Sequence, residues 1–431
     1  MAEHSKRGQG RWHRLDNTAN LFPVITSKRG SNVYRMTIDL TEPVAPELLQ
    51  QALEKTLPWF DAFRVRMRHG LFWFYLDANE NRPLVREEED YPCQTINPDQ
   101  NDEFLFKVTY YAHKINLEVY HVLSDGAGAL QFFQALCCQY LMLAHPAAFS
   151  PEDKQRHWFA EHAANTEDGY VENYTPTKKT TFKMGRGYRL RGERDVLGKL
   201  SVIHAHIPIK EILAFCRARE VSLSQYLTAV IGWAVYTQQL KQKPPSHPVN
   251  IFLPVNLRSL FESNTTLNFF SNVYISLKYD QQPMTFDTLL AEVKRQFEEK
   301  ISRQSMLEKI SYTVGSGYSL LVRAVPLPLK NFALRLIYEQ SAKSSTLGFS
   351  NVGIVKFPAP FEDYVRGAAV LLSTTQREPF KCAAFSCKGF LTLTFTSTLK
   401  SVGLQRAAIR QLAADGLPVT IESNGVDYAS L

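Results

Sequence analysis

The chain has 431 residues, of which 45% are hydrophobic and 21% are charged. This composition is typical of a folded globular protein, and the length fits two domains of roughly 200 residues each better than one core. The formal net charge of +7 is modest, and the basic residues are dispersed. We therefore expect no nucleic-acid partner.

The cysteine usage and the apolar segments indicate a cytoplasmic protein. No apolar run follows the basic residues near the N-terminus, so we predict no signal peptide. No window approaches 18 consecutive apolar residues, so we predict no transmembrane segment. The six cysteines are scattered and lack the His or second Cys pair of a metal site. We expect reduced cysteines and no bound metal.

Strand and helix patterns alternate in the first half of the chain. Apolar residues at every second position predict strands, and apolar residues at helical spacing predict helices. We expect a strand at 32–40, a helix at 46–57, a hairpin at 62–77, strands at 104–111 and 116–120, and a helix after residue 125. This interleaving predicts a layered α/β domain.

The second half repeats this order of elements. We expect a strand at 200–207, helices at 210–219 and 222–239, strands at 249–255 and 272–278, a helix at 286–301, strands at 348–355 and 367–372, a hairpin at 381–397, and a helix at 404–414. The sequence thus predicts two similar α/β domains, 1–190 and 191–431, the first ending in a crossover linker.

The predicted linker, within residues 145–195, is rich in basic residues. They are Lys178, Lys179, Lys183, Arg186, Arg189 and Arg191. The glycines among them do not fit the spacing of a dinucleotide-binding loop. Two interpretations stay open: these residues meet a phosphate group, or they are simply solvated.

The most informative feature is an H-x-x-x-D-G signature running from His121 to Gly126, where a predicted strand gives way to a predicted helix. A chain with 11 His and 21 Gly contains this pattern by chance only about 0.02 times. The small residues Gly126, Ala127 and Gly128 permit a tight turn and a close approach of backbone or substrate.

The residue types in the signature suggest proton transfer. A histidine at a strand end is neutral near physiological pH and accepts a proton from an alcohol or amine that attacks a thioester. Beyond a tight turn, Asp125 points away from the imidazole, so we expect it to lock the loop through an ion pair. Arg258, the last residue of the P-V-N-L-R segment at 254–258, is the candidate partner. The plainer alternative is a strand-end histidine followed by a helix-capping Asp125.

Together with the F-S-N-V-G segment at 349–353, these motifs resemble the chloramphenicol-acetyltransferase-like superfamily of CoA-dependent acyltransferases, most nearly its alcohol acetyltransferases. The resemblance covers most of the chain. It implies two α/β domains with a substrate tunnel between them, which acyl donor and acceptor enter from opposite faces. It also implies that His121 is the general base, that Asp125 pairs with Arg258 in a structural role, and that the segment from Ser350 to Gly353 lines the tunnel.

Two departures from the motifs of related branches argue against a peptide-synthetase condensation domain and against plant-type substrates. Condensation domains of peptide synthetases usually carry two histidines, and Tyr120 replaces the first one here. The D-F-G-W-G motif of the plant branch is also absent.

Ser350 and Asn351 are either hydrogen-bond donors to a tetrahedral oxyanion or ordinary polar residues at a strand end.

The sequence therefore predicts an acyltransferase that moves an acetyl or short acyl group from CoA to an alcohol, with acyl-CoA as co-substrate and no other cofactor. One alternative is a condensation enzyme that forms an ester or amide from a donor on an acyl carrier protein. Another is a non-catalytic binding member, which side chains blocking the tunnel at His121 would favour. The acceptor, the acyl length and the oligomeric state stay open.

Overall fold

The computed structural model describes residues 13–15, 19–27, 30–161, 163, 165–175, 185–195, 199–241, 245–279, 284–317 and 325–425. Lys6, Arg7 and Arg11 near the N-terminus, and Lys178, Lys179 and Lys183 of the linker, lie outside these ranges.

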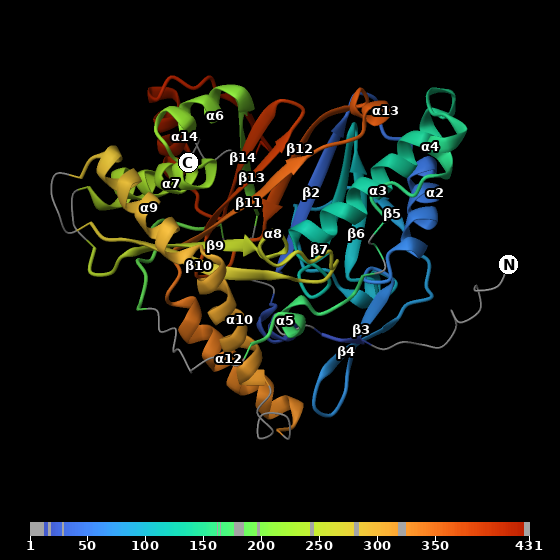
Figure 1. Ribbon diagram of the computed structural model, residues 1–431, viewed down its shortest axis with the longest axis horizontal. Helices are drawn as coiled ribbons and strands as arrows, with labels where there is room; N and C mark the ends of the chain where they lie inside the picture. The colour runs from blue at the N-terminus through green and yellow to red at the C-terminus, as the bar shows by residue number, and fades with distance from the viewer. Residues whose placement is uncertain are drawn as a thin grey trace.

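The first half of the chain contributes four strands to a five-stranded sheet with strand order β12-β2-β7-β6-β5. Its strands are β2 (Val33–Leu40), β5 (Val85–Glu87), β6 (Phe106–Tyr111), β7 (Lys114–Tyr120) and β12 (Val365–Leu372). The helices α2 (Pro46–Thr56) and α3 (Gly126–Ala144) pack against each other beside this sheet (Figure 1). Met36, Ile38 and Leu40 of β2 are buried in this core, as the period of two predicts.

The second half builds a seven-stranded sheet with strand order β10-β9-β11-β13-β14-β8-β15. Its strands are β8 (Ser201–Pro208), β9 (Val249–Asn256), β10 (Phe270–Leu277), β11 (Leu347–Val355), β13 (Phe380–Cys387), β14 (Phe390–Ser397) and β15 (Thr420–Ser423). Four helices lie beside this sheet (Figure 1): α6 (Ile209–Ala218), α7 (Leu223–Val235) and α9 (Phe286–Lys300) contact its strands, and α14 (Gly403–Ala414) contacts α7. Their apolar faces form a second core.

The remaining elements lie around these two sheets. A small sheet has strand order β1-β4-β3, from β1 (His13–Arg14), β3 (Val65–His69) and β4 (Phe74–Ala78). The short helices are α1 (Phe22–Ile25), α4 (Pro151–Gln155), α5 (Gly169–Glu172), α8 (Arg258–Phe261) and α13 (Ala359–Glu362). Two longer helices are α10 (Arg303–Gly317), which contacts α5 and β10, and α12 (Leu327–Ala342), which contacts α1 (Figure 1).

The residues that predict where these elements begin and turn adopt the expected local geometry. Ser222 caps α7 in a reciprocal capping box with Gln225. The turn between β13 and β14 places both Lys388 and Gly389 at positive φ, 43° and 82°, as a two-residue hairpin turn requires. The expected α/β class is confirmed.

One strand crosses between the halves. β12 comes from the second half of the sequence but pairs antiparallel with β2 at the edge of the first sheet. It also contacts β13 and β14 of the second sheet. The two halves are therefore joined by an exchanged strand, which the sequence pattern did not predict.

Among the described residues, α3 alone is long and apolar enough to cross a membrane by length and composition. Two thirds of it, 67%, is buried inside the protein. Its buried residues belong to the core of the first half.

Candidate active site

The imidazole of His121 lies where the two halves meet. The residue directly follows β7, and its N–H donates to the carbonyl of Asn32 at 3.0 Å. Phe22 stacks on the ring with a centroid distance of 4.8 Å, and Tyr34 meets it edge-on at 5.0 Å. Phe270, at the start of β10, approaches from the second half at 5.7 Å. Elements from both halves thus enclose the ring, and His121 itself is only half-buried.

Asn268 fixes the tautomer of this histidine. Its Nδ2 donates to the backbone carbonyl of His121 at 3.1 Å, so its Oδ1 faces the ring, 3.2 Å from Nδ1. Because a carbonyl oxygen only accepts hydrogen bonds, Nδ1 must carry the proton. The lone pair is then on Nε2, where a general base needs it.

The surroundings also favour the neutral imidazole. Burial lowers the pKa of His121, and the nearby charge of Lys381 lowers it further, whereas Asp125 and the hydrogen bond with Asn268 act in the opposite direction. The net shift of the pKa is downward. His121 is therefore unprotonated at neutral pH and available to accept a proton.

Asp125 forms the predicted ion pair with Arg258. The carboxylate caps α3 by accepting from the N–H groups of Ala127 and Gly128 at 3.1 and 3.0 Å. Its other oxygen accepts from Nη1 of Arg258 and from the N–H of Phe269, both at 2.8 Å. Burial opposes ionisation, but the charge of Arg258 and these hydrogen bonds hold the pKa of Asp125 below its usual range. The carboxylate thus ties the N-terminus of α3 to the second half.

Arg258 is itself fully engaged. Nε donates to the carbonyl of Thr265 at 2.9 Å, and Nη2 donates to the carbonyl of Leu267 at 2.6 Å. Only 9% of its side chain is exposed. The arginine therefore shapes the 265–269 segment that carries Asn268.

The glycine that the turn needs is Gly128 rather than Gly126. A Cβ at Gly128 would lie 2.2 Å from the carbonyl oxygen of Thr266, a distance that no side chain tolerates. A Cβ at Gly126 would meet Met36 and Val352 at an ordinary 3.7 Å. The close approach of backbone expected of this turn is thus made at Gly128, against the second half.

Ser350 and Asn351 occupy opposite sides of β11. Ser350 pairs in register with Ala383, which belongs to the core of the first half, so Ser350 faces that half. Asn351 instead donates through Nδ2 to Oγ of Ser224 in α7 at 2.9 Å, and its Oδ1 accepts from the N–H of Gly353. The amide of Asn351 thus has a structural use, which leaves Ser350 as the candidate of the two for the oxyanion donor.

No activated nucleophile accompanies the histidine in the part of the chain that the structure describes. Ser124 is fully buried and donates to the carbonyl of Thr266 at 2.6 Å. Burial raises the pKa of all six cysteine thiols. Among the described residues, no group of three or more His, Cys, Asp or Glu side chains could hold a metal ion.

A cavity of about 1170 Å³ with charged, polar and apolar lining residues lies between the two sheets. Arg35 and Thr37 of β2 line one wall, and His204 and His206 of β8 line another. His121 is not among its lining residues. The substrate tunnel expected at His121 therefore stays a prediction.

The sequence pointed to His121, Asp125 and Arg258 but not to Asn268. Asn268 lies 147 positions from His121, and no motif links the two. The aromatic residues Phe22, Tyr34 and Phe270 were also missed, because each belongs to a different element.

No protein-family model matches the sequence, and no curated protein matches it. Solved structures do. A trichothecene 15-O-acetyltransferase from Fusarium sporotrichioides superposes with a TM-score of 0.59 at 10% identity, covering 95% of each chain. TRI101 of F. sporotrichioides, solved with coenzyme A and T-2, has a TM-score of 0.59 at 12% identity, covering 95% of this chain and 99% of that chain.

The starter condensation domain of rhizomide synthetase RzmA, solved with C8-CoA and Leu-SNAC, has a TM-score of 0.55 at 12% identity. The match covers 94% of this chain and 93% of that one. The protein thus has the chloramphenicol-acetyltransferase-like fold shared by condensation domains and CoA-dependent acyltransferases. At these identities the likeness establishes the fold, and the chemistry has to be argued from the site.

Proposed function

We propose that this protein is an acyltransferase that moves an acetyl or short acyl group from a CoA thioester directly to an alcohol hydroxyl. The observation that carries the proposal is the hydrogen bond between Nδ1 of His121 and Oδ1 of Asn268, which leaves Nε2 as the basic nitrogen. The lowered pKa keeps this nitrogen unprotonated at neutral pH.

In the proposed reaction, Nε2 takes the hydroxyl proton as the alcohol oxygen attacks the thioester carbonyl. The carbonyl π electrons move onto oxygen, and Ser350 is the candidate donor to this oxyanion. When the carbonyl re-forms, the carbon–sulfur bond breaks. The thiolate of CoA then takes the proton from the imidazolium, so that the base is regenerated.

Direct transfer fits the absence of an activated nucleophile among the described residues. The hydroxyl of Ser124 is committed to Thr266, and the raised pKa values of the thiols disfavour a thiolate. Both substrates would then have to be bound together before the chemistry. We expect initial rates against both substrates to give intersecting double-reciprocal lines, and Ser124→Ala to transfer acyl groups without forming an acyl-enzyme.

Two alternative functions, the rivals of this proposal, predict different features of the site. A condensation enzyme would take its donor from an acyl carrier protein. A non-catalytic binding protein would leave the imidazole covered, and the stacking of Phe22 on the ring is the feature that favours this second rival. Phe22→Ala should leave transfer absent in a non-catalytic protein, whereas in an enzyme it should change KM.

The test combines a panel of acyl-CoA donors with alcohol and amine acceptors. Transfer is measured as the release of free thiol. His121→Ala should lower acceptor-dependent release by roughly 100- to 10,000-fold with an unchanged circular dichroism spectrum. His145→Ala is the matched control, because His145 caps the far end of the same helix, α3. Turnover of His121→Ala within about threefold of wild type would remove the residue from the mechanism.

A wild-type protein inactive with every acyl-CoA but active with a carrier-bound thioester would identify the condensation rival. Inactivity with both donors, despite intact folding, would favour a binding protein.

A further inference from the structure

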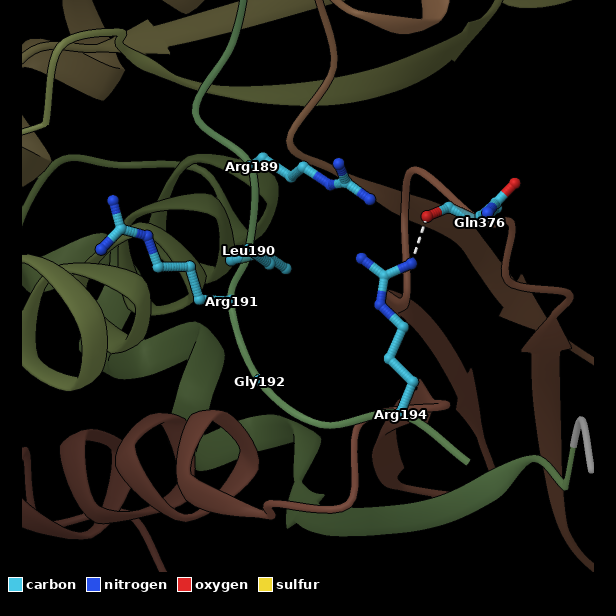
Figure 2. Close-up of a pocket in the computed structure, with 6 residues that line it drawn as sticks. All are labelled: Arg189, Leu190, Arg191, Gly192, Arg194 and Gln376. Carbon is cyan, nitrogen blue, oxygen red and sulfur yellow. Dashed lines mark hydrogen bonds between the residues drawn. The ribbon is translucent and has the colours of Figure 1, made fainter. Parts of the chain in front are cut away.

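Two arginines converge on one depression in the segment before β8. The depression has a volume of about 480 Å³ and is lined by Arg189, Leu190, Arg191, Gly192, Arg194 and Gln376. In Figure 2 the side chains of Arg189 and Arg194 point toward each other, whereas Arg191 points away to the other side of the loop. Arg194 also donates to the backbone carbonyl of Gln376.

The backbone that carries these arginines is held in place. Tyr188 and Leu190 are buried in the core of the second half, so Arg189 and Arg191 project outward. The side chain of Gln239 bonds both backbone groups of Arg191, at 3.0 and 2.9 Å. Gly192, with φ of 139°, turns the chain so that Arg194 faces Arg189. The fold thus positions the backbone of both arginines, and the bond to Gln376 also holds the guanidinium of Arg194.

This pair of positive charges has no counter-charge among the described residues. None of the ion pairs found there includes Arg189, Arg191 or Arg194, and Glu193 pairs with Lys400 instead. Burial and the charge of Arg189 lower the pKa of Arg194, which indicates that the two cations repel each other. A dianion between them would relieve this repulsion.

The depression is connected to His121 through the loop that carries Gln376. Ser373, three residues earlier, donates its N–H to the carbonyl of Val33 at 3.3 Å. Val33 pairs with Tyr120, the residue before His121. At about 3.6 Å per residue and about 5 Å between paired strands, Gln376 lies no more than roughly 25 Å from His121. A pantetheine arm spans a distance of this order.

We infer that Arg189 and Arg194 bind a phosphate monoester, and that this group is the 3′-phosphate of the acyl-CoA donor. The inference rests on the proposed function for the identity of the donor. A phosphate monoester carries close to two negative charges at neutral pH, which matches two unpaired guanidinium groups. The pyrophosphate of CoA carries a single charge on each phosphorus and matches them less well.

The test measures the dissociation constants of CoA and of dephospho-CoA, which lacks the 3′-phosphate, by calorimetry at fixed ionic strength. Wild-type protein should bind CoA about tenfold tighter than dephospho-CoA, or more, because charge-assisted hydrogen bonds are among the strong ones. Arg189→Ala and Arg194→Gln should each reduce this ratio to about one without changing the affinity for dephospho-CoA. Arg191→Ala is the matched control and should keep the ratio, and Arg189→Lys should keep part of it.

A ratio that persists in Arg189→Ala and Arg194→Gln, or a wild-type protein that does not distinguish the two ligands, overturns the inference. Inorganic phosphate that binds as tightly as CoA would make this a free-anion site and also overturn it. The proposed function is judged separately with an S-acyl-pantetheine donor. His121→Ala should abolish transfer from that donor, and Arg189→Ala should leave it unchanged.

Discussion

Replacing Asp125 tests how the two halves of the protein are held together. The carboxylate accepts four hydrogen bonds, two from the first turn of α3 and two from the second half. Asp125→Asn keeps the oxygen that caps the helix, since Asn and Asp are equally good caps. It places an NH₂ group against two donors, Nη1 of Arg258 and the N–H of Phe269. The guanidinium, 9% exposed, is then left without its counter-charge.

Breaking a buried ion pair by removing one partner costs about 3–5 kcal/mol of the free energy of unfolding. Asp125→Ala should lose roughly 1 kcal/mol more, because the helix cap is lost as well. The double variant Asp125→Asn/Arg258→Met should lose less than the sum of the two single variants, by about 0.5–3 kcal/mol, because it removes both charges. Urea unfolding followed by circular dichroism and tryptophan fluorescence measures these variants, together with the single variant Arg258→Met that the comparison needs.

The pH dependence of this effect has a defined sign. The pKa of Asp125 is lower in the folded state, so its contribution is fully present above the unfolded pKa of about 3.9 and is lost as pH falls through the folded pKa. The difference between wild type and Asp125→Asn should therefore be constant from pH 5 to 8 and shrink only in strong acid. Two results would refute the idea that this ion pair holds the two halves together. One is a free energy of unfolding of Asp125→Asn within about 1 kcal/mol of wild type. The other is a double variant whose loss equals the sum of the losses of the two single variants.

Two further predictions concern the turn and the base. Gly128→Ala should destabilise the protein by about 1–3 kcal/mol or more, because the new Cβ would lie 2.2 Å from the carbonyl oxygen of Thr266. Gly126→Ala should be tolerated, and equal melting temperatures for the two variants would contradict the structure. The lowered pKa of His121 should place the acid limb of kcat/KM below pH 6.5, since the active form is neutral. In Asn268→Asp the new carboxylate favours the imidazolium, so the limb should move to higher pH; an unmoved limb would mean that Asn268 does not control the base.

Local sequence signals predicted the elements well, because their determinants lie within each segment. The capping box at Ser222 and the turn residues Lys388 and Gly389 act over a few residues. α10 and α12 were missed. On α12, Leu329, Phe332, Leu336 and Ile337 follow helical spacing in the sequence, but this apolar face is exposed in the structure.

Features that depend on contacts between the halves could not be predicted. The destination of β12 is set by pairing with β2, more than 300 positions away, and its own sequence fits either sheet. The motif contains Gly126, yet it is Gly128, two residues beyond the motif, that approaches the backbone of Thr266. Such distinctions arise from packing between segments that are far apart in the sequence.

The hydrogen bonds of Asp125 explain how a residue turned away from the imidazole can still matter to it. Asp125 holds the N–H of Phe269, and the residue before Phe269 is Asn268, which orients the ring of His121. Arg258, the partner of Asp125, holds the carbonyl of Leu267 on the other side of Asn268. The ion pair of Asp125 and Arg258 and the tautomer of His121 are therefore linked. The aspartate of the signature, contributed by the first half, positions a segment of the second half. That segment in turn positions the histidine.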